Sequence, residues 1–373
     1  MKVGIVTMFY DSCNYGGILQ AYALTKALGK MGVESEQIRY RLASAYPFKR
    51  RIKIVGKKYL NELRQVRNLS VIMKLHKRSH IVKRAAEELV PHSKGVYSER
   101  TISRCTHKYD GFITGSDQVW SQNWPAYFLD FVPAEKTKIA YAVSIGNSTL
   151  PQNEIDYIKN YAKTFTAISV REEDSAGKLD KIIEGKKIEL TLDPTLLLNR
   201  EDWEAITSPR LVSEEYLFCY FLGSDERIRK LALEYASKNN LKVVTIPHMQ
   251  QRVENNDLRF GDEQAFYASP QDFLSYIKFA NAVFTDSFHA CVFSQVFQKR
   301  YFVFGRREFA KMSNRIITLT HLFATESRFV GNEKDYSLAY INSLNDIEYS
   351  IPVDDYLKRK QDSLRFLECN LNL

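Results

Sequence analysis

The chain has 373 residues, of which 45% are hydrophobic and 26% charged, and its formal net charge at pH 7 is +9. This length is nearer to that of two domains than of one. The longest apolar stretch, 216–223, is far shorter than the roughly 20 residues of a membrane helix, and the first residues do not have the pattern of a secretory leader. Five widely spaced cysteines without a CxxC pair exclude a typical zinc site or disulfide framework, so we expect a soluble cytoplasmic protein.

The first part of the chain alternates apolar β-type runs with amphipathic stretches, as an α/β lobe does. Helical spacing over residues 18–32 ends at Gly32, and the apolar runs on either side predict a β–α–β opening. Strands are predicted at residues 2–10, 33–40, 109–114, 138–146 and 167–170, and a second helix at 153–165. Residues 188–198 are predicted to form a strand and then a turn at Asp193-Pro194.

A strongly basic segment, residues 49–104, interrupts this pattern and contains helical patches such as 71–90. It holds 16 Lys and Arg residues against 4 acidic ones, a net charge of +12, which leaves −3 for the rest of the chain. Two interpretations remain open. The segment forms a peripheral contact with the anionic inner face of the cell membrane, or it is a solvated helical hairpin that packs on the first lobe.

The α/β pattern starts again at about residue 211 and predicts a second lobe. Its strands are expected at 214–223, 241–249, 281–287 and 300–305, and its helices at 225–240, at 269–280 and from Phe288 onward. The predicted fold is therefore α/β with two Rossmann-like lobes. The predicted divisions are 1–205 with the basic helical insertion at about 49–104, then 206–340, then a helical tail, 341–373, that packs back on the N-terminal lobe.

Ligands of open parallel sheets bind beyond the carboxyl ends of the strands, so polar residues that follow apolar runs are candidate site residues. The first such place is the stretch DSCNYGG, which contains Asn14, Tyr15, Gly16 and Gly17. Its glycines permit close backbone approach, and the helix that follows offers N–H groups to an anion. A plain tight turn explains the glycines equally well.

The second place is GSDQVW, with Gly115, Ser116, Asp117, Gln118 and Trp120. A hydroxyl, a carboxylate, an amide and an indole within six residues favour a site for a sugar. The alternative is that Asp117 is only a helix N-cap.

The third place follows the strand AISV, where Arg171 could hold a carboxylate or phosphate through two hydrogen bonds. The alternative is an ion pair with Glu172 or Glu173, although neighbours along the chain rarely face each other. The fourth place is LDPT, where Asp193 before Pro194 is expected to make a turn.

The fifth place is TDSFH, where a predicted strand ends at Asp286 and Ser287 and a helix starts with His289 in its first turn. The positive end of the helix dipole disfavours the imidazolium form, and a neutral histidine can act as a base, or as an acid beside a bound anion. The alternative is a structural histidine, which is the more common role of a single histidine.

Taken together, NYGG, DGFITGSDQVW, SVRE with a serine four residues after the arginine, LDPT, and VFTDSFHA followed by KRYFVF resemble the polysaccharide pyruvyl transferases. The resemblance runs in order from Lys2 to about Arg315. It implies a two-lobed fold similar to the GT-B glycosyltransferases, with an active-site cleft between the lobes. It also implies transfer of a pyruvyl group from phosphoenolpyruvate to two hydroxyls of one sugar, in bacterial exopolysaccharide biosynthesis, without a metal or other cofactor.

The resemblance assigns roles to these residues. It implies that His289 is the acid/base, that Asp117 activates or orients the sugar hydroxyls, and that Arg171 holds the donor. Some members have arginine at the position of Ser287, so a second donor-binding arginine is expected elsewhere, with Arg315 as the candidate. The expected acceptor-binding or loop residues are Asn14, Tyr15, Gly16, Gly17, Gly115, Ser116, Gln118, Trp120 and Asp286. Ala290 and Cys291 depart from the Gly-Thr of related sequences.

The partners expected on this basis are phosphoenolpyruvate and a sugar acceptor. An acceptor attached to polyprenyl pyrophosphate would give the basic segment a reason to contact the membrane. Two other functions stay open: a GT-B nucleotide-sugar glycosyltransferase, which would release a nucleotide in place of phosphate, and a non-catalytic protein that binds an anionic polymer. Nucleic acid is not an expected partner, because no recognised reading module or stripe of exposed aromatic residues is present.

Overall fold

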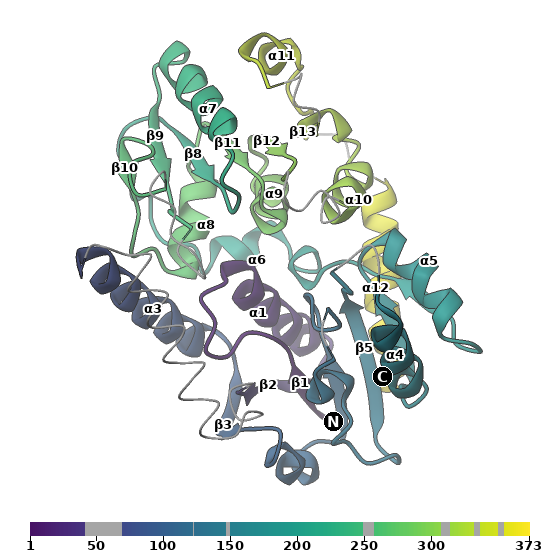
Figure 1. Cartoon of the computed structure of the whole chain (residues 1–373). Coiled ribbons are helices and arrows are strands. Elements are labelled where there is room, and N and C mark those ends of the chain that lie inside the picture. The colour runs from purple at the N-terminus through teal and green to yellow at the C-terminus, as the bar shows by residue number, and fades with distance from the viewer. Residues whose placement is uncertain are drawn as a thin grey trace. The chain divides into compact units, whose positions relative to one another are not determined.

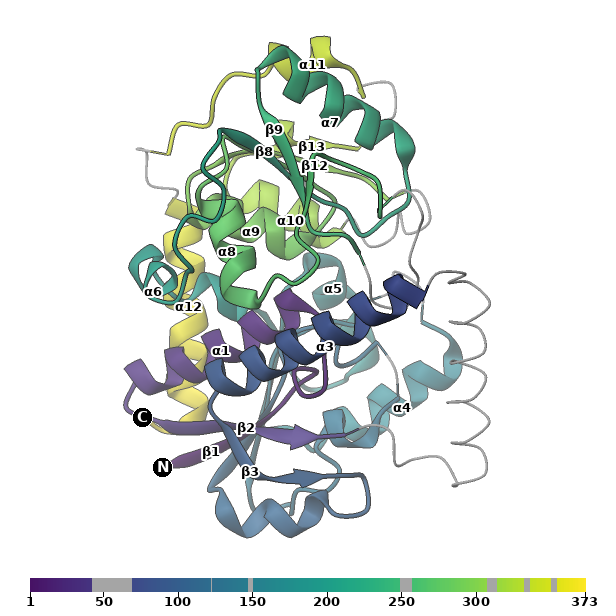
Figure 2. The same cartoon turned by 90° about the vertical axis from the view of Figure 1, so that its left-hand side faces the viewer.

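The computed structural model describes residues 1–41, 69–121, 123–146, 150–248, 257–306, 314–331, 336–349 and 354–373. The chain divides into two compact units (Figures 1 and 2). Unit 1 comprises Met1–Met73, Lys83–Leu198 and Arg359–Leu373, and unit 2 comprises Lys74–Val82 and Asn199–Lys358. None of the described helices is both long enough and apolar enough to cross a membrane.

The described part of unit 1 contains a seven-stranded parallel sheet in the order β3-β2-β1-β4-β5-β6-β7. Its strands are β1 Lys2–Val6, β2 Glu34–Tyr40, β3 His92–Tyr97, β4 Gly111–Thr114, β5 Thr137–Val143, β6 Ala167–Val170 and β7 Ile188–Leu190. Its helices are α1 Tyr15–Lys30, α3 Leu69–Leu89, η2 Ile102–Lys108, η3 Pro125–Phe128, α4 Gln152–Ala162, α5 Glu173–Ile182 and η4 Pro194–Leu196. The central strands β1, β4 and β5 are buried almost throughout, as expected when a parallel sheet is covered on both faces.

The described part of unit 2 contains a six-stranded parallel sheet in the order β10-β9-β8-β11-β12-β13. Its strands are β8 Tyr216–Tyr220, β9 Lys242–Thr245, β10 Glu263–Gln264, β11 Ala282–Thr285, β12 Arg300–Phe304 and β13 Phe329–Val330. Its helices are α6 Arg200–Glu204, α7 Glu226–Lys238, α8 Pro270–Lys278, α9 Phe288–Val296, α10 Asn314–Leu322, η6 Glu326–Arg328 and α11 Leu338–Ser343. Figure 2 shows α7 and α11 on one face of this sheet and α8 and α9 on the other.

Aromatic side chains fill both cores. In unit 1, the indole of Trp120 stacks on Phe128 with the ring centroids 4.9 Å apart. In unit 2, Phe284 on β11 contacts Phe302 and Phe304 on the neighbouring strand β12 at centroid distances of 5.3 and 5.4 Å. Large apolar rings of this kind pack together with many buried aliphatic side chains and help to stabilise each unit.

The C-terminal helix α12, Asp354–Leu371, contributes its residues from Arg359 onward to unit 1. The hydroxyl of Ser363 accepts a hydrogen bond from the backbone N–H of Leu192 at 2.9 Å, and the ring of Phe366 lies 6.1 Å from that of Tyr141 on β5. Figure 1 shows α12, in yellow, alongside β5. The end of the chain therefore packs on the edge of the sheet that carries β5 to β7.

The predicted strands and helices are confirmed with end shifts of several residues, but further elements were not predicted, among them the strands β3, β10 and β13 and the helices α5, α6, α10 and α11. The prediction of a helical insertion over 49–104 is wrong at its C-terminal end, because His92–Tyr97 forms the edge strand β3. In this strand Ser93 and Tyr97 are buried while Lys94 and Val96 are exposed, and its polar residues resemble those of the basic segment around it. Residues 49–68 of that segment lie outside the described residues.

The predicted divisions also differ in detail from the observed units. The first unit ends its main run at Leu198, where a boundary was expected at 205, and α11 lies in unit 2, where the tail was expected to start at 341. Helix α3 contributes its middle, Lys74–Val82, to unit 2. Sequence periodicity shows that a helix has a buried face, but it does not show which part of the protein will cover that face.

A first prediction concerns Gly115, which directly follows β4. Its φ is +108°, and a Cβ atom there would lie 2.3 Å from the carbonyl oxygen of Tyr141 on β5. Because a backbone oxygen on a central strand cannot move aside, Gly115→Ala should lower the free energy of unfolding by at least about 2 kcal/mol. The unfolding midpoint in urea, followed by circular dichroism, measures this loss.

Gly177→Ala is the matched control, because Gly177 lies inside α5 and a Cβ there would meet nothing within 4 Å. Alanine is the better helix former, so this variant should gain about 0.5–1 kcal/mol. Equal midpoints for the two variants would show that the Gly115 contact does not constrain the fold.

Candidate functional site

In each unit, the connections from two neighbouring central strands run in opposite directions along the sheet. These pairs are β1 and β4 in unit 1 and β8 and β11 in unit 2. Open parallel sheets bind ligands at such switch points, beyond the carboxyl ends of the strands. Most of the predicted site residues follow one of these four strands, so they lie at the two switch points.

In unit 1, the loop between β1 and α1 approaches the loop after β4. Asn14 caps α1, and its side-chain oxygen accepts a hydrogen bond from the N–H of Gly16 at 3.1 Å. A Cβ atom on Gly17 would lie 3.5 Å from Oδ2 of Asp117. The first turn of α1 therefore lies against the Asp117 carboxylate, whereas Tyr15 is a core residue that is 1% exposed.

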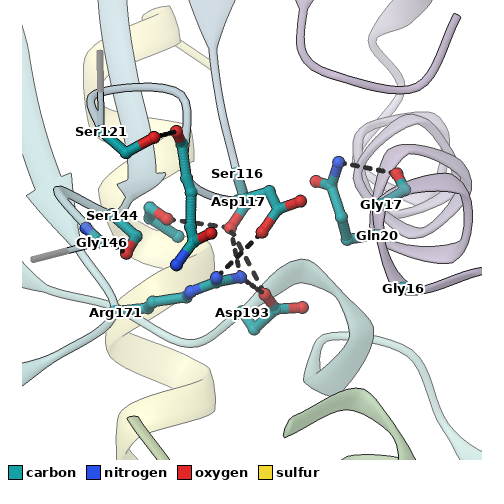
Figure 3. A network of polar contacts seen from close by, with 12 residues as sticks. Gly16, Gly17, Gln20, Ser116, Asp117, Ser121, Ser144, Gly146, Arg171 and Asp193 are labelled. Atoms are coloured by element: carbon teal, nitrogen blue, oxygen red, sulfur yellow. Dashed lines mark hydrogen bonds and ion pairs between the residues drawn. The ribbon is translucent and has the colours of Figure 1, made fainter. Parts of the chain in front are cut away.

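Hydrogen bonds between buried groups connect these two loops. The hydroxyl of Thr7 donates to the carbonyl oxygen of Ser116 at 2.9 Å, and the amide of Gln20 donates to Thr7 at 3.1 Å and to the carbonyl of Gly17 at 2.9 Å. Ser116 donates in turn to the carbonyl of Ala142 on β5 at 2.8 Å. Figure 3 shows Gln20 beside Gly17, and Ser116 next to Asp117. These bonds hold the loop after β4 in one conformation.

The loop after β4 places its predicted site residues in different environments. Asp117 has a φ of +71°, and its backbone oxygen accepts from the N–H of Ser144 at 3.0 Å. Residues 118–121, directly after it, are not helical, so the N-cap alternative is wrong. Gln118 approaches Gly146, where a Cβ would lie 3.4 Å from its Nε2. Trp120 is 2% exposed, and its N–H donates to the carbonyl of Tyr127. An indole satisfied in this way is expected to stabilise the loop rather than contact a sugar.

Arg171 is the centre of a buried ionic cluster, which we name the Arg171 cluster and which comprises Arg171, Asp117, Glu172 and Asp193. The guanidinium donates from Nη2 to Asp117 at 3.1 Å, from Nε to Glu172 at 3.2 Å, and from Nη1 to Asp193. Figure 3 shows the guanidinium pointing between the carboxylates of Asp117 and Asp193. Burial lowers the pKa of Arg171, but the attraction of Asp193, Glu172 and Asp117 outweighs it and raises the pKa above the usual value.

This geometry bears on the expected role of Arg171 in binding the donor. Its side chain is 1% exposed, and with all four groups ionised the Arg171 cluster has a net charge of −2. A doubly or triply charged donor anion would be repelled there. The ion pair with Glu172, considered improbable for neighbours in sequence, is present because the long arginine side chain folds back to it. The geometry therefore favours a role in holding Asp117.

Asp193 does more than make the predicted turn. Its Oδ1 accepts from the N–H and the hydroxyl of Thr195 at 3.0 and 2.6 Å and caps η4, while Oδ2 faces Arg171. One side chain thus fixes the LDPT turn and joins it to the loop after β6.

In unit 2, Asp286 organises the switch point. Its two carboxylate oxygens accept hydrogen bonds from the backbone N–H groups of Leu222 and Gly223, in the loop after β8, at 2.7 and 2.8 Å. Ser287 follows as the N-cap residue of α9, and its side chain makes no capping hydrogen bond. His289 lies in the first turn, is 8% exposed, and meets the ring of Phe288 edge-on at 5.1 Å.

Two arginines lie near the connection between β11 and α9, and the sequence analysis named only one of them, Arg315. The guanidinium of Arg315 lies 5.9 Å from the ring centroid of Phe288. Arg306, which follows β12, donates from Nε and Nη2 to the carbonyl oxygen of Asp286 at 3.1 and 2.8 Å. The rule applied to the other strands, that polar residues after an apolar run are candidates, would have found Arg306 after RYFVFG.

His248, in the segment that follows β9, was also missed. Burial and the charge of Arg78 lower the pKa of His248 to about 4, with smaller lowering effects from Arg306 and Arg229 and an opposing effect from Asp286. Its neighbour Pro247 accepts a hydrogen bond from the guanidinium of Arg78. The imidazole is therefore neutral at pH 7 and has several cationic groups around it.

Several lysines in the described part of the basic segment contact aromatic or acidic side chains of the protein. In unit 2, the ammonium groups of Lys74 and Lys77 lie 3.9 and 4.5 Å from the ring centroids of Phe266 and Tyr267. In unit 1, Lys83 pairs with Asp11 at 2.7 Å. Within the described ranges, no group of three or more His, Cys, Asp or Glu side chains is arranged to hold a metal ion.

Two parallel sheets with flanking helices and a switch point in each define a protein of the GT-B class, with two Rossmann-like lobes. The structure is similar to UDP-GlcNAc 2-epimerase from Methanocaldococcus jannaschii, with a TM-score of 0.59 and 12% identity over 100% of both chains. It is also similar to UDP-N-acetylglucosamine 2-epimerase from Rickettsia bellii, with a TM-score of 0.55 and 11% identity over 100% of this chain and 96% of the other. Such low identities establish the fold alone.

The family follows from the sequence. The polysaccharide pyruvyl transferase family model matches residues 14–307, which is most of the chain, and this protein belongs to that family. No curated protein gives a sequence match. The resemblance expected from NYGG, GSDQVW and TDSFH is therefore confirmed at the level of the family, and the predicted pair of Rossmann-like lobes is confirmed at the level of the fold.

A second prediction concerns the Arg171 cluster. Arg171→Met should lower the free energy of unfolding by about 3–5 kcal/mol, because three carboxylates would remain buried without their cation. Part of this loss should be recovered on acidification, as the carboxylates take up protons. Urea unfolding at pH 7.5 and pH 5 measures both effects.

Arg200→Met is the control, because its ion pair with Glu204, at 3.0 Å, joins two partly exposed side chains. This change should cost less than about 1 kcal/mol. If Arg171→Met were no more destabilising than the control, the Arg171 cluster would not be a structural constraint.

A third prediction concerns the dependence of stability on pH. Between pH 6.5 and about 4, the unfolded chain protonates His248 while the folded protein does not, so the folded state loses stability as the pH falls through this window. His248→Gln should remove this contribution, which amounts to roughly 3 kcal/mol at pH 4. His321→Gln, at a side chain that is 68% exposed, should leave the slope unchanged. Parallel pH profiles for wild type and His248→Gln would contradict the prediction.

Proposed function

We propose that this protein transfers a pyruvyl group from phosphoenolpyruvate to two hydroxyls of one sugar, forming a cyclic ketal and releasing phosphate. The observation that carries the proposal is the position of His289. The TDSFH motif of a pyruvyl transferase family member lies at the switch point of unit 2, with this histidine in the first turn of α9. General acid–base catalysis needs a proton-transferring side chain near the bound ligand, most often a histidine, and this position supplies one.

The proposed reaction needs proton transfers and anion binding. A proton is added to the methylene carbon of phosphoenolpyruvate, which develops positive charge at C2, and a sugar hydroxyl attacks C2 and gives up its proton. The C2–O bond to phosphate then breaks, the second hydroxyl attacks C2, and its proton leaves with the phosphate. The two hydroxyl protons thus end on the new methyl group and on phosphate, and no oxidant or reductant is required.

His289 is the group that we propose for the proton transfer to or from the reacting atoms. Its place at the start of α9 favours the neutral imidazole before the donor binds, because the helix dipole is positive there. A bound anion would then favour the protonated form, which is the acid that the first step requires. The buried, largely water-free surroundings at 8% exposure would strengthen this interaction.

For the acceptor, we propose the switch point of unit 1. Asp117 has Oδ1 paired with Arg171, and its Oδ2 lies next to the first turn of α1, where a Cβ on Gly17 would be 3.5 Å away. A carboxylate held in this way can accept a hydrogen bond from a sugar hydroxyl without moving, and Gln118 adds an amide nearby. The negative charge of the Arg171 cluster suits a neutral sugar better than the anionic donor.

A fourth prediction tests the assignment of His289. His289→Gln should reduce pyruvyl transfer by at least about 100-fold while the circular dichroism spectrum is unchanged, because a general acid–base contributes factors of this size. The measurement is phosphate release from phosphoenolpyruvate with a panel of galactosides and mannosides, together with mass spectrometry for the added pyruvyl group.

His321→Gln is the matched control on α10 of the same unit, where the side chain is exposed. It should retain wild-type turnover. Undiminished turnover in His289→Gln would refute the role of this histidine. Release of a nucleotide from a UDP- or GDP-sugar, without phosphate release from phosphoenolpyruvate, would replace the proposal with a glycosyltransferase function.

A further inference from the structure

The carboxyl edge of the unit 2 sheet gathers basic side chains that the family pattern does not account for. The segments that follow β8, β9, β11 and β12 all end there, because the strands are parallel. They bring Gly223, His248, Asp286 and Arg306 to one edge, and buried arginines on α3 and α7 support them. The sequence has serine, Ser287, at the position where some family members have an arginine.

Arg306 is anchored in a way that leaves much of its binding capacity unused. Its Nε and Nη2 donate to the carbonyl oxygen of Asp286, which is a neutral acceptor, and Nε lies 3.5 Å from the Asp286 carboxylate. That carboxylate already accepts the N–H groups of Leu222 and Gly223. Among the described residues, Nη1 of Arg306 has no hydrogen-bond partner, and the side chain is 14% exposed. The guanidinium is thus fixed in direction, with the two N–H donors of Nη1 and one of Nη2 left for a ligand.

Gly223 makes this arrangement sterically possible. A Cβ atom on it would lie 3.0 Å from Oδ2 of Asp286 and 3.6 Å from Cγ of Arg306. A larger residue would push the arginine stem away from the carboxylate. The close packing of these three residues shows that the position of Arg306 is built into the loops, and is not that of a mobile surface arginine.

Two buried arginines hold the neighbouring loops. Arg229 on α7 donates to the carbonyl of Gly223 at 2.9 Å and pairs with Asp257, and its side chain is 6% exposed. Arg78 on α3 is 3% exposed and donates to the carbonyl of Pro247, next to His248. Both cations are positioning residues for these loops, and both add positive potential at this edge.

The charge balance of this edge favours an anion. The charges of Arg78, Arg229, Arg306 and Asp286 all act on His248, and Asp257 pairs with Arg229. These three cations and two carboxylates sum to a net charge of +1. Burial and the charges of these arginines lower the pKa of His248 and keep its imidazole neutral. The imidazole can therefore form hydrogen bonds, and a bound anion would offset the positive charge of the arginines and allow it to take up a proton. The Arg171 cluster of unit 1 has the opposite sign.

We propose that Arg306 and His248 form a phosphate-binding subsite of unit 2, which holds the phosphate of phosphoenolpyruvate and supplies the cation that is absent at Ser287. This inference rests on the proposed function, since it names the donor of that reaction. Phosphate is favoured over the donor carboxylate because its dianion has three oxygens for two separate donor groups and carries the higher charge. Arg315, the earlier candidate, stacks near Phe288 and is assigned no phosphate contact.

The test measures binding without turnover. Isothermal titration of the full-length protein with inorganic phosphate and with phosphoenolpyruvate should give affinities that fall 10- to 100-fold in Arg306→Ala, the range for a lost charged hydrogen bond. Arg306→Lys should recover part of the affinity, because it keeps the charge and loses the fork geometry. Arg259→Ala, at an exposed arginine of unit 2, is the control and should bind as wild type does.

The outcomes separate this subsite from the proposed function. If Arg306→Ala, or Arg306→Lys should the first variant fail to fold, binds both anions as tightly as wild type, the subsite is wrong. Loss of affinity in Arg315→Ala alone would also overturn it in favour of that arginine. If phosphate binding depends on Arg306 but phosphoenolpyruvate is not turned over with any acceptor, the phosphate subsite stands and the pyruvyl transfer proposal fails. Tighter, Arg306-dependent binding of UDP would overturn the assignment to phosphoenolpyruvate.

Discussion

The guanidinium of Arg171 is the constraint on which the candidate site of unit 1 depends. Its donors reach Asp117 after β4, Glu172 after β6 and Asp193 before η4, so three loops are fixed by one buried cation. Desolvating these four charges is costly, and their mutual contacts, together with hydrogen bonds from Thr195 to Asp193 and from Ser175 to Glu172, offset that cost. The arrangement explains why Asp117 can adopt a positive φ and still present a carboxylate in one direction.

Unit 2 uses the reverse arrangement at its own switch point. There a carboxylate, Asp286, is the buried anchor, and backbone N–H groups and Arg306 gather around it. The two edges consequently differ in sign, with excess negative charge at the Arg171 cluster and excess positive charge near Arg306. A neutral sugar is not repelled by the negative edge of unit 1, and a small polyanion is attracted to the positive edge of unit 2. For this reason the proposals assign the sugar to unit 1 and phosphoenolpyruvate to unit 2.

The sequence predicted the strands that are buried on both faces, because runs such as GIV, GFIT and AVFT are apolar without interruption. It failed for β3 at the edge of the sheet, where HSKGVY exposes alternate residues, and for the short strands β10 and β13. It also missed α5, whose residues EDSAGKLDKI carry few apolar side chains to mark a helical face. Edge and surface elements are stabilised mainly by their neighbours, so their own periodicity is weak.

The sequence by itself determined the α/β class, the family and the positions of the polar residues that end the strands, because hydrophobic periodicity and short motifs are local properties. Only the tertiary structure decided what these residues contact. Arg171 meets Asp117 across 54 positions in the chain, and Arg306 meets Asp286 across 20. Trp120 lies in the core. Arg306 and His248 lie at the same edge of the unit 2 sheet because the strand order decides which carboxyl ends are neighbours, and the local sequence pattern does not encode that order.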